Sequence, residues 1–171
     1  EEFFITILMK NEGEYTIPAG GVIGSLSGIV QSSFSIKNMD KKSSNEVFGT
    51  AKDGDLIIPG GEELLEFGSA MFKPELPGPI TFNIKADVCY NYGTESVSKL
   101  CLRRDVLKKG MGDVCTINKN NIATENSGAS VHVANLREST MGGNKVKVTF
   151  KVINKGIGKT YAPGTFTNSC V

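Results

Sequence analysis

Several residue types and patterns are scarce in this chain of 171 residues, and each absence excludes a class of protein. Tryptophan is absent and there is a single histidine, His132. No apolar run approaches the roughly 18 residues that a membrane-spanning helix needs. The 19 Lys and Arg residues nearly cancel the 18 Asp and Glu residues, so no net charge attracts nucleic acid or an anionic membrane. The sequence therefore predicts no nucleic-acid partner and no membrane span in this segment.

Patterns typical of catalysis and metal binding are missing as well. No Cys-x-x-Cys pair occurs, and His132 is far in sequence from every cysteine, so a zinc site is not indicated. His132 stands between Val131 and Val133 without a nearby Ser or Cys motif, which favours a structural or surface histidine over a member of a hydrolytic triad. The glycine-rich stretch "AGGVIGSLSG" lacks the Lys-Ser/Thr ending of a phosphate loop. We expect no enzymatic activity, no cofactor and no metal.

The cysteines, in contrast, are even in number, which favours two disulfides in an extracellular or cell-surface protein over four reduced thiols. They are Cys89, Cys101, Cys115 and Cys170, and they allow three pairings. Cys89 and Cys101 are symmetric about Glu95 in a segment that resembles two strands around a turn, so a hairpin would join them and leave Cys115 to Cys170. Such bridges would close loops of 13 and 56 residues, and the chain-entropy model gives them roughly 3 and 4 kcal/mol.

Alternating polar and apolar residues, with turns at short intervals, predict an all-β fold. Up to about Arg104 the pattern indicates six or seven short strands, which is typical of an immunoglobulin-like β-sandwich. After a polar stretch, two further strands are expected over 131–138 and 145–153. We predict an immunoglobulin-like β-sandwich at 1–110, a linker at 111–129 and a second, partial β-sandwich module at 130–171. A single jelly-roll-like domain is the alternative, and a bridge from Cys89 or Cys101 to Cys170 would favour it.

The two ends of the chain repeat one pattern: an alternating strand, then Asn-x-Gly, then Tyr, and then Pro close to Gly. "FITILMKNEGEYTIPAG" begins at Phe4 and "KVTFKVINKGIGKTYAPG" begins at Lys147. The matched pairs are Ile5 with Val148, Ile7 with Phe150, Met9 with Val152, Asn11 with Asn154 and Gly13 with Gly156. The repeat predicts two related modules. The first copy begins without a preceding strand or a signal peptide, which indicates a processed or trimmed piece.

These motifs carry a resemblance to a known group of domains. The strand "VKVTFKVINKGIG" (146–158) resembles the CARDB and fibronectin-III-like β-sandwich modules of secreted and surface proteins, which occur in tandem. "LIIPGGEELLEFG" is similar to the Pro-Gly-Glu turn of such modules, and "ADVCYNYGTESVSKLCL" is similar to Cys-bearing hairpins of surface or pilin-like archaeal proteins. The resemblance implies a fold and an extracellular setting, and it names no ligand.

Together these observations predict a non-enzymatic structural or adhesive protein, a cell-surface or filament (pilus-like) subunit that assembles through β-strand edges. A strand from a neighbouring chain would fill the open edge of the first module, and 131–138 with 145–153 would be the donor. Its partners would be further copies or other surface proteins. The residues expected to form the assembly strands are Phe3, Phe4, Ile5, Ile7, Val146, Val148, Phe150 and Val152.

A carbohydrate-binding or other ligand-recognition module is the alternative function, with glycans as partners. Tyr90 and Tyr92 share a face of a predicted strand and are candidate ligand contacts, although packing across the strands is the favoured explanation. Asp53 and Asp55 in "KDGD" have the chemistry of Ca²⁺ ligands, but the pattern lacks the twelve-residue calcium loop, and a hairpin turn is the favoured interpretation.

Overall fold

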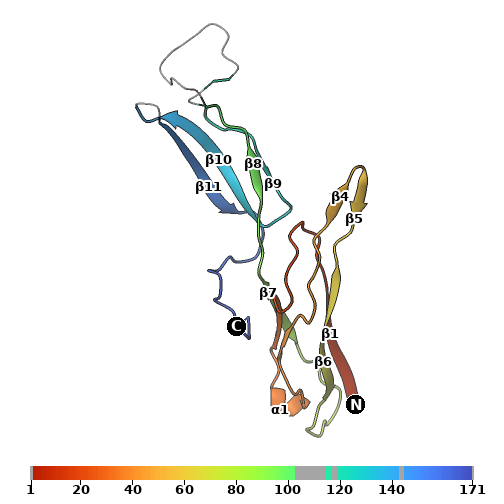
Figure 1. Ribbon diagram of the computed structural model, residues 1–171. Coiled ribbons are helices and arrows are strands. Elements are labelled where there is room, and N and C mark those ends of the chain that lie inside the picture. The colour runs from red at the N-terminus through yellow and green to blue at the C-terminus, as the bar shows by residue number, and fades with distance from the viewer. Residues whose placement is uncertain (1, 103–114, 117–118, 143–144, 171) are drawn as a thin grey trace. The chain divides into compact units, whose positions relative to one another are not determined.

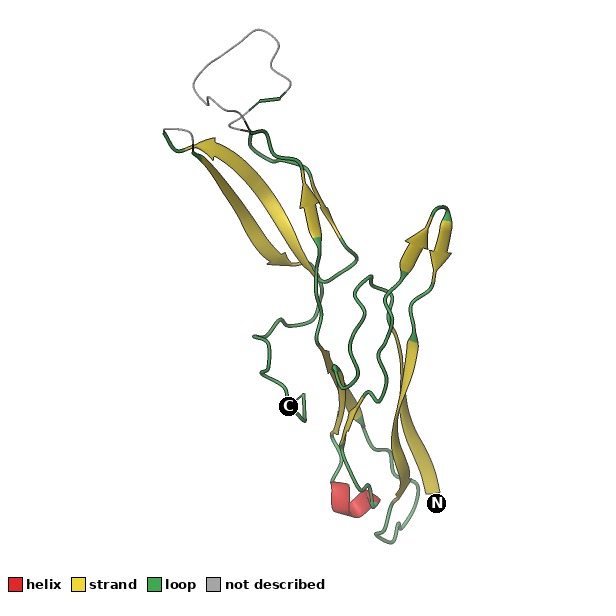
Figure 2. Cartoon of the chain, viewed as in Figure 1, coloured by secondary structure: helices red, strands yellow, loops and turns green. Residues whose placement is uncertain are grey.

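The computed structural model describes residues 2–102, 115–116, 119–142 and 145–170, and these form a nearly all-β protein (Figure 1). One short helix, α1 (Gln31–Phe34), interrupts the strands (Figure 2). The strands run in chain order as β1 (Glu2–Lys10), β2 (Val22–Ser27), β3 (Asp40–Lys42), β4 (Ala51–Asp53), β5 (Leu56–Ile58), β6 (Glu62–Met71), β7 (Lys85–Tyr90), β8 (Ser96–Ser98), β9 (Thr124–Asn126), β10 (Val131–Thr140) and β11 (Val146–Asn154). The predicted all-β class is therefore confirmed.

The chain divides into two compact units. Unit 1 contains Glu1–Tyr92 together with Tyr161–Val171, and unit 2 contains Gly93–Thr160. These boundaries differ from the predicted ones, because unit 2 is inserted in the sequence between the two parts of unit 1. Part of the expected linker at 111–129 lies outside the described residues, and its later part contains β9, which pairs with β8.

The core of unit 1 lies between two small antiparallel sheets. One sheet contains β1 and β6, and the other contains β3, β2 and β7 in that order. Every second side chain of β1, including Ile5 and Ile7, packs with Leu65 and Phe67 of β6 against Leu26 of β2. The alternation predicted for the first strand thus directs one side of β1 into the core.

Gly24 allows the two sheets of unit 1 to approach closely. A Cβ atom at this position of β2 would lie 2.7 Å from Leu65 Cδ1 and 3.3 Å from Ile7 Cδ1. A glycine inside a strand commonly marks such a close approach, because any side chain would push the neighbouring layer away. Gly24 therefore fixes the distance between the β1–β6 ladder and the sheet that covers it.

The long ladder between β1 and β6 contains a bulge. One additional residue of β6 lies between the pairs Phe4–Ser69 and Thr6–Glu66. Gly68, with φ of +83°, supplies the backbone conformation there, which residues with a Cβ rarely adopt. The bulge brings Ala70 to the same buried side as Leu65 and Phe67.

Unit 2 contains a second long ladder of the same kind, between β10 and β11. It too has a bulge, between the pairs Ala134–Lys151 and Arg137–Thr149. The additional residue is on β10, where Asn135 has φ of +53°. Both ladders thus pair a regular strand with a bulged partner.

The disulfide pairing predicted from hairpin symmetry is wrong. Cys89 is bonded to Cys170, and Cys101 to Cys115. The expected hairpin around Glu95 does not form, because β7 pairs with β2 and β8 pairs with β9. The Cys89–Cys170 bridge is the one expected of the single-domain alternative, and it ties residue 170 to β7 in unit 1, although residues 93–160 form a separate compact unit. The prediction of two modules that follow one another along the chain is therefore wrong.

The turn interpretation of "KDGD" agrees with the structure. Asp53 ends β4, Gly54 and Asp55 form the turn, and β5 begins at Leu56. Gly54 has φ of +59°, which the tight hairpin requires. Among the described residues no group of three or more His, Cys, Asp or Glu side chains is placed to hold a metal ion.

Candidate functional site

The two strands that end in Asn-x-Gly, β1 and β11, lie at open edges of their sheets. Within the described ranges β1 pairs with β6 alone and β11 pairs with β10 alone. The second edge of each strand therefore presents backbone N–H and C=O groups without a strand beside them, and such edges are sites where another strand can add. The residues predicted as assembly strands lie on these two strands.

The outer side of β1 carries large apolar side chains that are exposed. Phe4 is 74% exposed and Leu8 is 66% exposed. Leu64, directly across the ladder from Leu8, is exposed as well, and so is Met71 at the far end of β6. The β1–β6 ladder thus carries large apolar side chains on both sides, those of one side in the core and those of the other exposed among charged residues.

On β11 the apolar side chains that match the core side of β1 are exposed. Val148 is 39% exposed, Phe150 is 53% exposed and Val152 is 63% exposed. In unit 1 the equivalent side chains lie against β2, whereas in unit 2 the small β8–β9 sheet contacts β10 and leaves these side chains of β11 exposed. The apolar side of β11 therefore resembles the core-facing side of β1, but its side chains are exposed to solvent.

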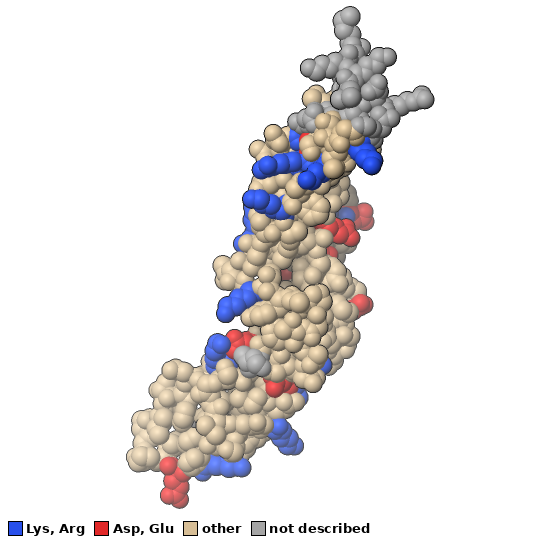
Figure 3. Space-filling model, turned by 90° about the vertical axis from the view of Figure 1, so that its left-hand side faces the viewer, with Lys and Arg blue, Asp and Glu red and all other residues tan. Residues whose placement is uncertain are grey.

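The opposite side of β11 is basic. Lys147 and Lys151 alternate with the apolar residues, and the segment 145–159 contains five lysines and no acidic residue. Figure 3 shows lysine and arginine side chains (blue) grouped on unit 2. Because like charges repel, this strand disfavours pairing with a second basic strand. It favours a partner with acidic side chains.

The tyrosines expected to contact a ligand do come together, and a third tyrosine joins them. The rings of Tyr90 and Tyr92 meet edge to face with centroids 5.8 Å apart, and Tyr15 lies 5.4 Å from Tyr92. The Tyr92 hydroxyl accepts a hydrogen bond from the Tyr15 N–H at 3.4 Å. Tyr92 lies between the other two rings, and burial raises the pKa of its phenol. Tyr90, at 50% exposed, is available to solvent.

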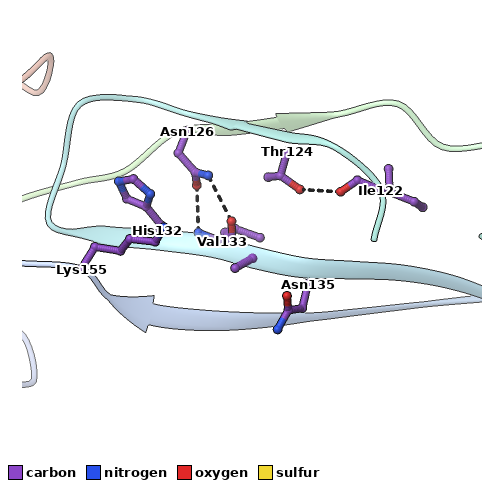
Figure 4. Close-up of a pocket in the computed structure, with 8 residues that line it drawn as sticks. Ile122, Thr124, Asn126, His132, Val133, Asn135 and Lys155 are labelled. Atoms are coloured by element: carbon purple, nitrogen blue, oxygen red, sulfur yellow. Dashed lines mark hydrogen bonds between the residues drawn. The ribbon is translucent and has the colours of Figure 1, made fainter. Parts of the chain in front are cut away.

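An open hollow of about 380 Å³ lies beside β9 and β10 in unit 2 (Figure 4). The Asn126 amide in its wall donates to the Val133 carbonyl at 3.0 Å and accepts the Val133 N–H at 2.8 Å, so it serves the backbone. His132 Nε2 lies 2.9 Å from the Ala129 carbonyl oxygen. This contact holds the imidazole ring of β10 against the loop that precedes the strand. It agrees with a structural role for the histidine.

Sequence reasoning missed a buried carboxylate in unit 2. Glu138 is 2% exposed. Its Oε2 accepts the Cys101 N–H at 3.4 Å, and its Oε1 has no hydrogen-bond partner among the described residues. Strict alternation would have placed Glu138 on the side opposite Val133, but the bulge at Asn135, which is not visible in the pattern of residue types, turns Glu138 to the same side as Val133.

Comparisons with protein-family models, with curated proteins and with solved structures found no match to this chain. No helix in the described part of the chain is long and apolar enough to span a membrane. The function is therefore inferred from the geometry of the strand edges and the tyrosines.

Proposed function

We propose that the protein is a non-enzymatic structural or adhesive subunit of an extracellular assembly, such as a surface layer or a pilus-like filament, and that it associates through β-strand edges. The observation that carries the proposal is that β1 and β11 have open edges and exposed apolar side chains. Among the residues that the structure describes, each is a long strand paired on one side only, and each presents large apolar side chains to solvent. Monomeric proteins usually protect such edges with charge, proline or a covering loop.

The two disulfides support an extracellular setting. Bonds of this kind form and persist in oxidising compartments, and they compensate small domains for limited cores. Cys89–Cys170 serves unit 1, and Cys101–Cys115 serves unit 2. Both units are thus stapled, as expected for a subunit that stays folded outside the cell.

The local sequence supports the proposal further. The resemblance of β11 and its Asn-x-Gly loop to CARDB and fibronectin-III-like modules suggests an immunoglobulin-like sandwich for each unit. The two sheets around the core of unit 1 agree with that arrangement. In unit 2 the sandwich would be partial, since β11 is uncovered.

The test is the association state of the oxidised chain across concentration. Analytical ultracentrifugation and electron microscopy should reveal assembly that grows with concentration and that is lost after reduction and dilution. A chain that remains monomeric at millimolar concentration, with both disulfides intact, would contradict the proposal.

Carbohydrate recognition is a second candidate function, favoured by one observation. Tyr90 offers a half-exposed ring that is held by Tyr92, and aromatic rings of this kind pack against sugars. A glycan array with the wild-type chain and Tyr90→Ala tests it. Tyr161→Ala is the matched control, because Tyr161 is similarly exposed and contacts a single ring, Phe166. Binding that is lost in Tyr90→Ala alone would favour this function.

A further inference from the structure

We propose that β11 of one copy of this chain adds to the open edge of β1 of a second copy, so that copies join head to tail. The inference rests on the proposed function and names the partner and the two strands. The partner is a second copy because this chain carries both an open strand edge that belongs to a net acidic ladder and a second open strand that is basic.

The first support is the correspondence between the two strands. Both β1 and β11 are nine residues long, both end at an Asn-x-Gly loop, and both pair with a bulged strand on one side only. Strands of equal length can pair along their whole extent, which satisfies the most backbone groups. The free edges of these two strands therefore match.

The second support is that β11 exposes apolar side chains whose counterparts on β1 are packed in a hydrophobic core. Ile5, Ile7 and Met9 of β1 pack against β2 and its neighbours in unit 1. Their counterparts on β11 are exposed. If β11 joined the edge of β1, its apolar side would continue the side of β1 that faces the core of unit 1.

The third support is charge. The strands β1 and β6 carry four acidic side chains and one basic side chain: Glu2, Glu62, Glu63, Glu66 and Lys10. The segment that contains β11 carries only basic ones. The acidic side chains lie mainly on β6, the strand beside β1, and their attraction for the lysines of β11 favours the encounter of the two ladders. The lysines of β11 disfavour contact of that strand with its own copy.

The apolar and charged side chains also determine the register in which β11 would pair with β1. With Phe150 on the side of Ile7, the lysines of β11 lie on the outer side of the sheet, where Glu66 of β6 is also found. A slip of one residue would turn Phe150 outward and place Lys151 toward the core. The register with Phe150 inward is therefore the one proposed.

The contact is heterologous, since a different surface is used on each copy. Every copy then has one β1 edge and one β11 edge to offer, and association continues as an open chain unless the rotation closes a ring. This geometry suits the proposed filament.

Complementation between two variants tests the proposal. Phe4→Lys with Leu8→Lys places positive charge beside the lysines of an incoming β11, and Phe150→Asp with Val152→Asp places negative charge on the core side. All four side chains are at least 53% exposed, so both variants should fold. We expect each variant alone to need at least tenfold more protein for assembly. An equimolar mixture should form 1:1 complexes that grow no further.

The matched control is Leu56→Lys with Ile57→Lys on β5, which changes equally exposed residues on another hairpin and should assemble like the wild type. If the wild type assembles but either variant alone does so normally, the assignment of strands is wrong while the proposed function stands. The same conclusion holds if the mixture forms no complex. If the wild type does not assemble at all, both proposals fail.

A second pair keeps the test decisive if an aspartate variant does not fold. Lys147→Glu with Lys151→Glu on β11 should weaken assembly, and so should Glu66→Lys with Glu62→Lys on β6. Mixing the two charge-reversed chains should restore the contact between them, with an affinity that falls as salt rises. Mixtures no stronger than either variant alone would overturn the proposed pairing.

Discussion

Asn11 and Asn154 make the same pair of local hydrogen bonds, although one follows the first strand of the chain and the other ends the last. Each side-chain Nδ2 donates to the carbonyl four residues on, at 2.8 and 2.7 Å, and each Oδ1 accepts the N–H two residues on, at 3.1 and 2.9 Å. Asn11 is buried and also donates to the Val47 carbonyl at 3.0 Å. The repeat in the sequence is therefore a repeat of local structure, in which Asn11 is buried and Asn154 is exposed.

This difference in depth predicts unequal costs for one substitution. Asn11→Ala removes a buried amide and its bonds, and it should reduce the free energy of unfolding by about 2–3 kcal/mol. Asn154→Ala removes the exposed copy of the same loop and should cost about 1 kcal/mol or less. Chemical denaturation of both variants measures the two values. Equal losses would show that the shared loop, and not burial, determines the cost.

The surroundings of Gly24 and Gly78 predict unequal losses of stability when each glycine is replaced by alanine. Gly24→Ala forces the layers apart at Leu65 and Ile7, and overpacking of this kind should cost about 1–3 kcal/mol. Gly78→Ala is the matched control, since a Cβ there meets no atom within 4 Å. That change should stay within about 1 kcal/mol of the wild type. Thermal melts of both variants provide the comparison, and a stable Gly24→Ala variant would contradict the close approach of the sheets.

The disulfides predict both a pairing and a ranking. Trypsin cleaves after Lys99 and so separates Cys89 from Cys101, and a non-reducing digest should link the Cys89 peptide to the C-terminal peptide. The bridges span 81 and 14 residues, so in the chain-entropy model their removal costs about 4–5 and about 3 kcal/mol. Denaturation of Cys89→Ala with Cys170→Ala, and of Cys101→Ala with Cys115→Ala, checks the order. A digest that links Cys89 to Cys101 would refute the pairing.

The hydrogen bonds of Glu63 predict that the free energy of unfolding depends on pH in the acid range. The Ser44 N–H, which donates to Oε1 at 2.8 Å, holds the pKa of Glu63 below its ordinary value of 4.5, with Asn45 assisting. A lowered pKa means that the carboxylate stabilises the fold above pH 4.5, and that this contribution is lost as the pH falls through the folded pKa. Glu63→Gln should therefore be less stable than the wild type at pH 7, with a gap that narrows in acid.

The measurement for Glu63 is a series of denaturant unfolding curves between neutral and acid pH. Glu66→Gln, on the same strand with its side chain on the outer side, is the control. A gap between Glu63→Gln and the wild type that is constant with pH would point to lost packing instead of lost charge.

The sequence predicted those features whose cause is local. The strands β1 and β11 alternate along their length and end at Asn-x-Gly, so their existence and bounds could be inferred. The Asp-Gly-Asp turn has the residues that its backbone requires.

Features that depend on distant segments were not predictable. Symmetry about Glu95 indicated a hairpin, but β7 instead forms a six-residue ladder with β2, more than fifty residues upstream, and no local pattern identifies that partner. The additional residue at Asn135 reverses which side of β10 is buried, and so it hid Glu138. Tyr15 joins Tyr92 only because folding brings their segments together.

The Cys89–Cys170 bridge determines how tension would travel through the chain. Unit 2 is joined to unit 1 at two points, after Tyr92 and before Tyr161. From the first point the chain runs back to Cys89, and from the second it runs on to Cys170, so both paths end at one covalent bond whose Cα atoms are 5.8 Å apart. A pull on unit 2 is therefore shared by two peptide segments that meet at the bridge, and it enters the sheet of unit 1 at Cys89, where β7 pairs with β2. In a filament under load, residues 90–92 and 161–169 would carry the tension in parallel, so the loss of one of the two segments would not by itself separate unit 2 from unit 1.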